Sequence, residues 1–248
     1  MLKVRNLTRH FGGLTAVCNV NLDVEDTCIF GILGPNGAGK TTLFNLLSGI
    51  FPCSAGEIYF NGQQVHGHAA HRIARLGIGR TFQIVRPFSE LTVMQNVLAA
   101  IGAKLGESLP VLLGEYDRIP YTDAARALLE LTGLGEHENE IAKNLPLGML
   151  RRLEIARALG LEPQLLLLDE SFSGLSHLEV EAQVELVRRL RSQGTGILLI
   201  EHNMQVAMNL CERIAVLDHG EKIAEGSPAE IAGNQQVIEA YLGRDYDA

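Results

Sequence analysis

Residues 34–42 read GPNGAGKTT, and this stretch decides the fold. It satisfies the pattern G-x-x-x-x-G-K-[ST] with Gly34, Gly39, Lys40 and Thr41. The glycines let the backbone curl so that successive N–H groups face one anion, and the following helix directs its positive end to the same point. Lys40 adds a charge for the β- and γ-phosphates, and the Thr41 hydroxyl can ligate Mg²⁺. The stretch therefore predicts a nucleoside-triphosphate site.

The residues on either side of this loop predict an α/β fold. Residues 28–33, CIFGIL, form a continuous apolar run that is typical of a buried strand, and residues 40–49 change to helical spacing. Further strands are expected near 57–60, 165–168, 196–200, 213–218 and 221–225, with helices near 69–76, 177–192 and 203–211. Such alternation predicts a parallel or mixed sheet covered by helices, preceded by an antiparallel β part within residues 1–33.

The middle of the chain has a different pattern. Residues 88–160 are poor in strand signals and contain VMQNVLAAIGA, AARALLELTGL and MLRRLEIARALG, which are helical patterns. We therefore expect one domain over 1–248 with a helical lobe, residues 88–160, inserted into it.

A second motif, LLLLDE, occupies residues 165–170. Its four apolar residues place Asp169 at the carboxyl end of a buried strand, the edge at which such sheets bind ligands. Asp169 suits the water shell of Mg²⁺, and Glu170 suits a general base or a water-orienting group. A strand followed by two acidic residues is common, so LLLLDE indicates a nucleoside-triphosphate site only in combination with the phosphate loop.

Composition excludes several classes of protein. Hydrophobic residues make up 46% of the 248 residues and charged residues 20%, which excludes disorder. The net charge of −8 argues against a general nucleic-acid binder. The four cysteines form no C-x-x-C pair, so we expect a reduced chain with buried thiols. No apolar run reaches the ~18 residues of a membrane span, so any membrane role is expected through a partner.

Further residues narrow the class of nucleotide hydrolase. No N-K-x-D motif, which a small GTPase would need, is present. Gln83 lies in GRTFQ, between the phosphate loop and LLLLDE. Two more motifs are LPLGMLRRLEIARAL at residues 145–159 and LLIEHN, which contains His202. In this order and spacing, the motifs resemble the ATP-binding subunit of ABC transporters over nearly the whole chain. The resemblance implies ATP and Mg²⁺ as ligands.

The resemblance also implies a role for each matching residue. Phe11 would stack on adenine, Gln83 would sense Mg²⁺ and the attacking water, and His202 would contact the γ-phosphate. Glu170 would be the catalytic glutamate, with Mg²⁺ held by Thr41, Gln83 and, through water, Asp169. The loop that binds ATP comprises Gly34, Pro35, Asn36, Gly37, Ala38, Gly39, Lys40, Thr41 and Thr42. Taken alone, Phe11 could simply be a core residue, and a histidine at the end of an apolar strand, such as His202, would more often be one.

Two segments depart from the family pattern. The family's signature begins LSGGQ, whereas this chain has Leu145, Pro146, Leu147, Gly148 and Met149. Ser176 stands where the family usually has Asn or Asp. In the family's head-to-tail dimer both segments serve the ATP site of the partner. The departures therefore favour a heterodimer with a second ATPase subunit, with a homodimer as the alternative.

The motifs RTFQ, RPFSELTVMQNV, RRLEIARAL and IEHNM are similar to those of bacterial branched-chain amino acid importers. The expected function is an ATPase that powers uptake of branched-chain or other hydrophobic amino acids. Urea or amide import, lipopolysaccharide export and a soluble, non-transport ATPase are the alternatives. The implied partners are membrane permeases, docked near Ile84–Phe88, and indirectly a solute-binding protein, with no nucleic acid. The implied location is the cytoplasmic face of the membrane.

Overall fold

Two β-sheets and the helices around them form the computed structural model, which describes residues 1–83, 85–105 and 119–242. The larger sheet has the strand order β10-β9-β3-β8-β7-β6, in which all neighbours are parallel except β10 and β9. Its strands are β3 (Ile29–Leu33), β6 (Ile78–Arg80), β7 (Leu165–Asp169), β8 (Gly196–Ile200), β9 (Arg213–Asp218) and β10 (Glu221–Gly226). The predicted α/β class with a mixed sheet is confirmed.

The smaller sheet is antiparallel with the order β2-β1-β4-β5. Its strands are β1 (Leu2–Phe11), β2 (Leu14–Val24), β4 (Ala55–Phe60) and β5 (Gln63–Gln64). β5 and β6 are not predicted from the sequence, because two or three residues are too few to show the alternation of apolar and polar residues that marks a strand. β6 forms only by pairing with β7, where Ile78 lies opposite Leu165.

The central strands are buried on both faces, which explains their continuous apolar runs. Phe30 and Ile32 of β3 pack toward helix α1 (Lys40–Leu47) and the antiparallel sheet. Ile29 and Leu33 pack in a second cluster with helices α7 (His177–Ser192) and α8 (Met204–Leu210). Burial on both faces holds the carboxyl ends of β3 and β7 rigidly, and the loops that carry the two motifs begin there.

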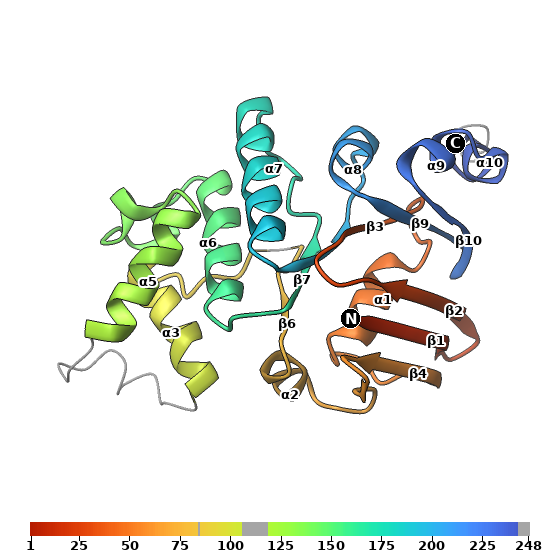
Figure 1. Ribbon diagram of the computed structural model, residues 1–248, viewed down its shortest axis with the longest axis horizontal. Coiled ribbons are helices and arrows are strands. Elements are labelled where there is room, and N and C mark those ends of the chain that lie inside the picture. Colours follow the sequence, from red (N-terminus) through yellow and green to blue (C-terminus); the bar gives the residue numbers. More distant parts are fainter. Residues whose placement is uncertain (84, 106–118, 243–248) are drawn as a thin grey trace.

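A third hydrophobic cluster lies among α3 (Val93–Leu105), α5 (Ile119–Leu131) and α6 (Leu147–Leu159). Figure 1 shows these helices at one end of the molecule and the antiparallel sheet toward the other. Helix α6 is shared between the two parts. Its Leu153 packs in the third cluster, whereas its Ile155 and Leu159 pack beneath the large sheet. Because α6 belongs to both cores, a displacement of the helical part moves a helix that packs on the sheet.

The remaining described elements are short. They are α2 (Ala70–Arg75), α9 (Pro228–Ala232), α10 (Gln235–Leu242) and the 3₁₀ turns Gly135–His137 and Ala142–Asn144. The expectation of buried thiols is wrong for Cys18, Cys28 and Cys53, which are half-buried, and holds for Cys211 alone. Within the described part of the chain, every helix is too short or too polar to cross a bilayer.

Candidate active site

The phosphate loop connects β3 to α1 and has a backbone that only glycine allows. Gly34 has φ +144°, and a Cβ there would lie 2.0 Å from the Leu217 carbonyl oxygen. Gly39 has φ +100°, and its Cβ would lie 2.4 Å from the Ala16 carbonyl oxygen. The backbone N–H of Gly34 donates to the Tyr241 hydroxyl at 2.8 Å, which ties the start of the loop to α10. Close neighbours therefore fix both ends of the loop.

Lys40 is buried at the first turn of α1. Its ammonium donates to the carbonyl oxygens of Gly34 at 2.6 Å and Pro35 at 3.0 Å. These bonds hold a positive charge over the loop and beside the helix N-terminus, which attracts anions. The arrangement can bind the phosphates of a nucleotide by charge and by backbone N–H groups together.

A cavity of about 460 Å³ opens over this loop. Ten of the expected site residues line it: Asn36, Gly37, Ala38, Gly39, Lys40, Thr41, Thr42, Gln83, Glu170 and His202. Five further lining residues are not predicted from the sequence: Leu14, Thr15, Ala16, His219 and Gly220. They come from β2 and from the turn between β9 and β10. The Gly220 N–H donates to the Ala38 carbonyl oxygen at 3.0 Å, so only the tertiary fold brings this turn to the loop.

Three of the expected residues meet across the cavity. The Glu170 carboxylate accepts a hydrogen bond from the Gln83 amide at 2.9 Å through Oε2. Its Oε1 lies 2.6 Å from His202 Nε2. Glu170 itself has a left-handed backbone with φ +49°, which is strained for a side chain of this size and is typical of functional sites. The three side chains offer a carboxylate, an amide and an imidazole to one point, a set that can orient a water molecule and transfer its proton.

Asp169 does not line the cavity and is only 1% exposed. Its Oδ2 accepts from the Arg80 guanidinium at 2.8 Å, whereas Oδ1 has no hydrogen-bond partner among the described residues. Burial raises the pKa of Asp169, and the bond to Arg80 opposes that rise. A buried carboxylate oxygen without a donor calls for a cation or a water. With the Thr41 hydroxyl in the cavity wall, the donor set consists of oxygens and fits Mg²⁺.

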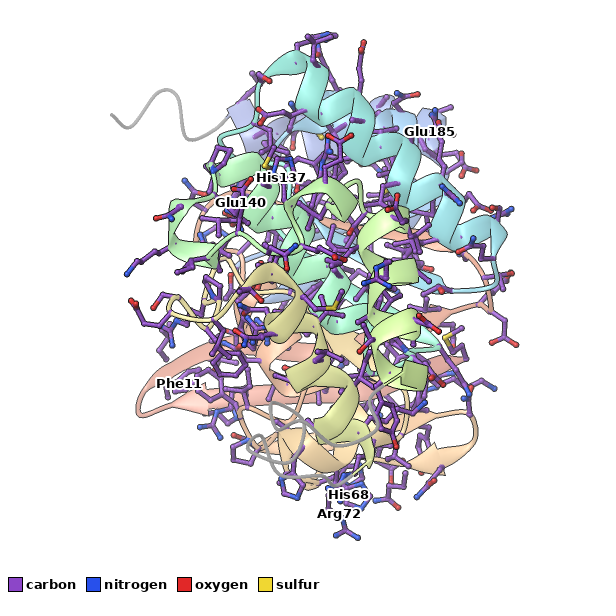
Figure 2. The ribbon with its side chains drawn as sticks, turned by 90° about the vertical axis from the view of Figure 1, so that its left-hand side faces the viewer. Phe11, His68, Arg72, His137, Glu140 and Glu185 are labelled. Atoms are coloured by element: carbon purple, nitrogen blue, oxygen red, sulfur yellow. The ribbon has the colours of Figure 1, made fainter. Side chains whose placement is uncertain are left out.

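Three other expected ATP contacts do not line the cavity. Gly34 and Pro35 are buried beneath it. Phe11 ends β1 close to the turn into β2, at the edge of the molecule in Figure 2. The ring is 39% exposed, packs edge-on against Phe51 at 5.4 Å and lies under the guanidinium of Arg9 at 4.6 Å. Stacking of Phe11 on adenine therefore stays a prediction.

The signature segment, residues 145–149, leads into α6 and does not line the cavity of its own chain. Pro146 is the N-cap of α6 and makes no side-chain capping bond. Gly148 packs against Glu179, because a Cβ there would lie 2.1 Å from the Glu179 Oε1. Ser176 caps α7 in a capping box with Glu179. This capping role of Ser176 is not predicted from the sequence, although S-x-x-E before a helical pattern is its signal.

Two protein-family models match parts of this chain. The model of the ABC transporter family matches residues 17–173, and that of the branched-chain amino acid ATP-binding cassette transporter matches 221–247. The chain is 43% identical to the high-affinity branched-chain amino acid transport ATP-binding protein LivG of Escherichia coli K12, with 98% of each chain covered. It is 40% identical to BraF of Pseudomonas aeruginosa, a protein of the same description, again over 98% of both.

Solved structures show the same architecture. The ADP conformation of MJ1267, an ATP-binding cassette of an ABC transporter, superposes with a TM-score of 0.87 at 29% identity and covers 98% of both chains. The family model spans both the phosphate loop and LLLLDE, and the relatives match from end to end. The chain belongs to the ABC transporter family and is one of its ATP-hydrolysing subunits.

Proposed function

We propose that this chain hydrolyses Mg-ATP to power the uptake of branched-chain amino acids. The observation that carries the proposal is the hydrogen-bonded set of Gln83, Glu170 and His202 facing the phosphate loop across one cavity. The choice of solute is supported by the names of LivG and BraF and by the match of residues 221–247 to the branched-chain model. That C-terminal match favours amino acid import over lipopolysaccharide export.

Each residue of the set has a role that follows from its chemistry. The loop N–H groups and Lys40 hold the β- and γ-phosphates, and Glu170 orients a water and accepts its proton. His202 donates to the γ-phosphate, and Gln83 adjusts the position of Glu170 through their bond. Thr41, Gln83 and Asp169 would hold Mg²⁺, which supplies charge that offsets the phosphates when it is bound. Phe11 is proposed as the adenine contact.

The helical lobe, residues 88–160, is proposed as the part that meets the membrane permease on the cytoplasmic face. A groove of about 440 Å³ lies between its helices and the strand that precedes Gln83. Phe82 and Phe88 line this groove and are 43% and 45% exposed. Exposed aromatic rings in a concave apolar surface are typical of a protein contact. A short cytoplasmic helix of the permease is the proposed occupant. Ile84, part of the expected docking segment, lies outside the described residues.

A second ATPase subunit is proposed to complete the working site. The signature segment starts a helix yet lines no part of this chain's own cavity, which supports its use by a partner. Pro146 carries neither a hydroxyl nor a backbone N–H to offer a phosphate. A homodimer would use this weakened segment twice, so the proposal favours a heterodimer whose partner has an intact signature. A solute-binding protein would act on the complex only through the permease.

The experiment is uptake into proteoliposomes that contain the permeases, the second ATPase and this chain, with the solute-binding protein outside. Radiolabelled leucine should accumulate with Mg-ATP inside the vesicles. Glu170→Gln should lower uptake and turnover at least ~100-fold while ATP still binds. Glu185→Gln, which removes an exposed carboxylate on α7, is the matched control. Uptake of urea but not leucine, or leucine uptake that survives Glu170→Gln, would contradict the proposal.

A further inference from the structure

Glu154 of α6 is a buried carboxylate that the catalytic set does not use. It is 6% exposed and lines the groove between the helical lobe and the sheet. Its Oε1 accepts the backbone N–H of Phe82 at 3.0 Å. Its Oε2 is buried and has no hydrogen-bond partner among the residues that the structure describes. One oxygen of this carboxylate is thus bonded within the chain, and the other is buried without a donor.

From one helix, Glu154 and Arg151 hold the two successive peptide units on either side of Phe82. While Glu154 accepts the N–H of Phe82, the Arg151 guanidinium donates to the Phe82 carbonyl oxygen at 3.2 Å. The next residue is Gln83, whose amide donates to the catalytic Glu170. A displacement of Glu154 is therefore transmitted to Gln83 through the backbone of one residue, Phe82.

We propose that Glu154 receives, on Oε2, a hydrogen-bond donor from the permease segment that docks in the groove, and so couples docking to the position of Gln83. This inference rests on the proposed function of the groove. It makes Glu154 a positioning residue: it does not line the nucleotide cavity and acts through the backbone of Phe82.

The surroundings of Glu154 define the chemistry of that donor. Arg80, Arg86 and Arg157 line the same groove, so a further cation would be repelled. A neutral donor is favoured, and the free N–H groups at the start of a short helix are a ready source. Burial raises the pKa of Glu154 to about 7, so its charge is held only weakly by the groups present. A donor on Oε2 would stabilise the charged form.

Two variants separate the contacts of the carboxylate. Glu154→Gln keeps a carbonyl oxygen for the N–H of Phe82 but presents an amide donor where the partner needs an acceptor. Glu154→Ala removes both contacts. Glu185→Gln, which removes an exposed carboxylate outside the groove, is the matched control (Figure 2). Thermal unfolding of each isolated variant shows which of them fold.

The assay is titration of this chain into permeases held in nanodiscs, followed by ATP turnover at saturating solute-binding protein and leucine. A lost hydrogen bond to a charged group predicts at least ~10-fold weaker assembly for Glu154→Gln. Glu154→Ala should also lose stimulation by leucine at saturating permease, whereas Glu154→Gln should retain most of it. A merely structural role would not weaken the assembly of Glu154→Gln while sparing its stimulation, so affinity and stimulation together are the deciding measurement.

The possible results distinguish a failure of the inference about Glu154 from a failure of the proposed function. If the unaltered chain does not assemble with the permeases, the proposed function is wrong. If it assembles but Glu154→Gln binds with the same affinity as Glu185→Gln, the inference alone is overturned. Equal loss of leucine stimulation in Glu154→Gln and Glu154→Ala would also overturn it. If Glu154→Ala does not fold, the affinity of Glu154→Gln decides.

Discussion

Tyr241→Phe should destabilise the protein by removing one oxygen atom. The Tyr241 hydroxyl accepts the N–H of Gly34 at 2.8 Å, and Gly34 is buried at the start of the phosphate loop. Phenylalanine preserves the packing of the ring in the second core cluster, so the perturbation is confined to the hydrogen bond. It leaves a buried N–H without an acceptor, which costs about 1–3 kcal/mol of folding free energy.

The loss can be measured by urea denaturation and by thermal unfolding. A change of ~1 kcal/mol shifts the unfolding temperature of a chain of this size by about 2–4 °C, so a fall of roughly 2–12 °C is expected. Because Gly34 fixes one end of the loop, the affinity for ATP should also fall, by roughly 2- to 12-fold if half of that free energy is lost from binding.

Tyr59→Phe is the matched control. Its hydroxyl donates to Glu57 on the exposed surface of β4, so its loss should change stability by no more than about 0.5 kcal/mol. Equal unfolding midpoints for the Tyr241→Phe and Tyr59→Phe proteins would refute the role of the bond in stability. A destabilised Tyr241→Phe protein with unchanged ATP affinity would refute its role in positioning the loop.

Four further outcomes are expected. Lys40→Ala should abolish tight ATP binding, measured by calorimetry, while the circular dichroism spectrum stays that of the folded chain. Burial raises the folded-state pKa of Glu201 from 4.5 to about 7, so the unfolded chain binds fewer protons between these values and stability falls as pH rises through them. Glu201→Gln should flatten that fall in urea titrations at pH 5 and pH 8; an unchanged pH slope would show that Glu201 is not its source. Pro146→Ser with Met149→Gln in the assembled dimer should raise turnover at the partner's site about 10- to 100-fold, and no gain would show that the signature departure is tolerated. Phe88→Ala should weaken assembly with the permeases about tenfold, and normal assembly would remove the ring from the docking surface.

The sequence alone determines the class of the protein, because its decisive features are local. GPNGAGKTT and LLLLDE each need only one strand and its following turn to form, so their residues specify both the motif and its place in the fold. The runs CIFGIL and LLLL predict strands buried on both faces for the same reason. The central strands and the phosphate loop follow from patterns shorter than twenty residues, and the family follows from the order and spacing of several such motifs along the chain.

Only the tertiary structure decides what surrounds these motifs. Residues Thr15 and His219 reach the cavity from a strand and a turn far from the phosphate loop in sequence, and no short pattern marks them. Strand β6 exists because β7 pairs with it. The two oxygens of Glu154 become distinct only when α6 packs beside Phe82. Contacts between distant segments depend on how whole elements pack, and a one-dimensional pattern of polar and apolar residues does not contain that information.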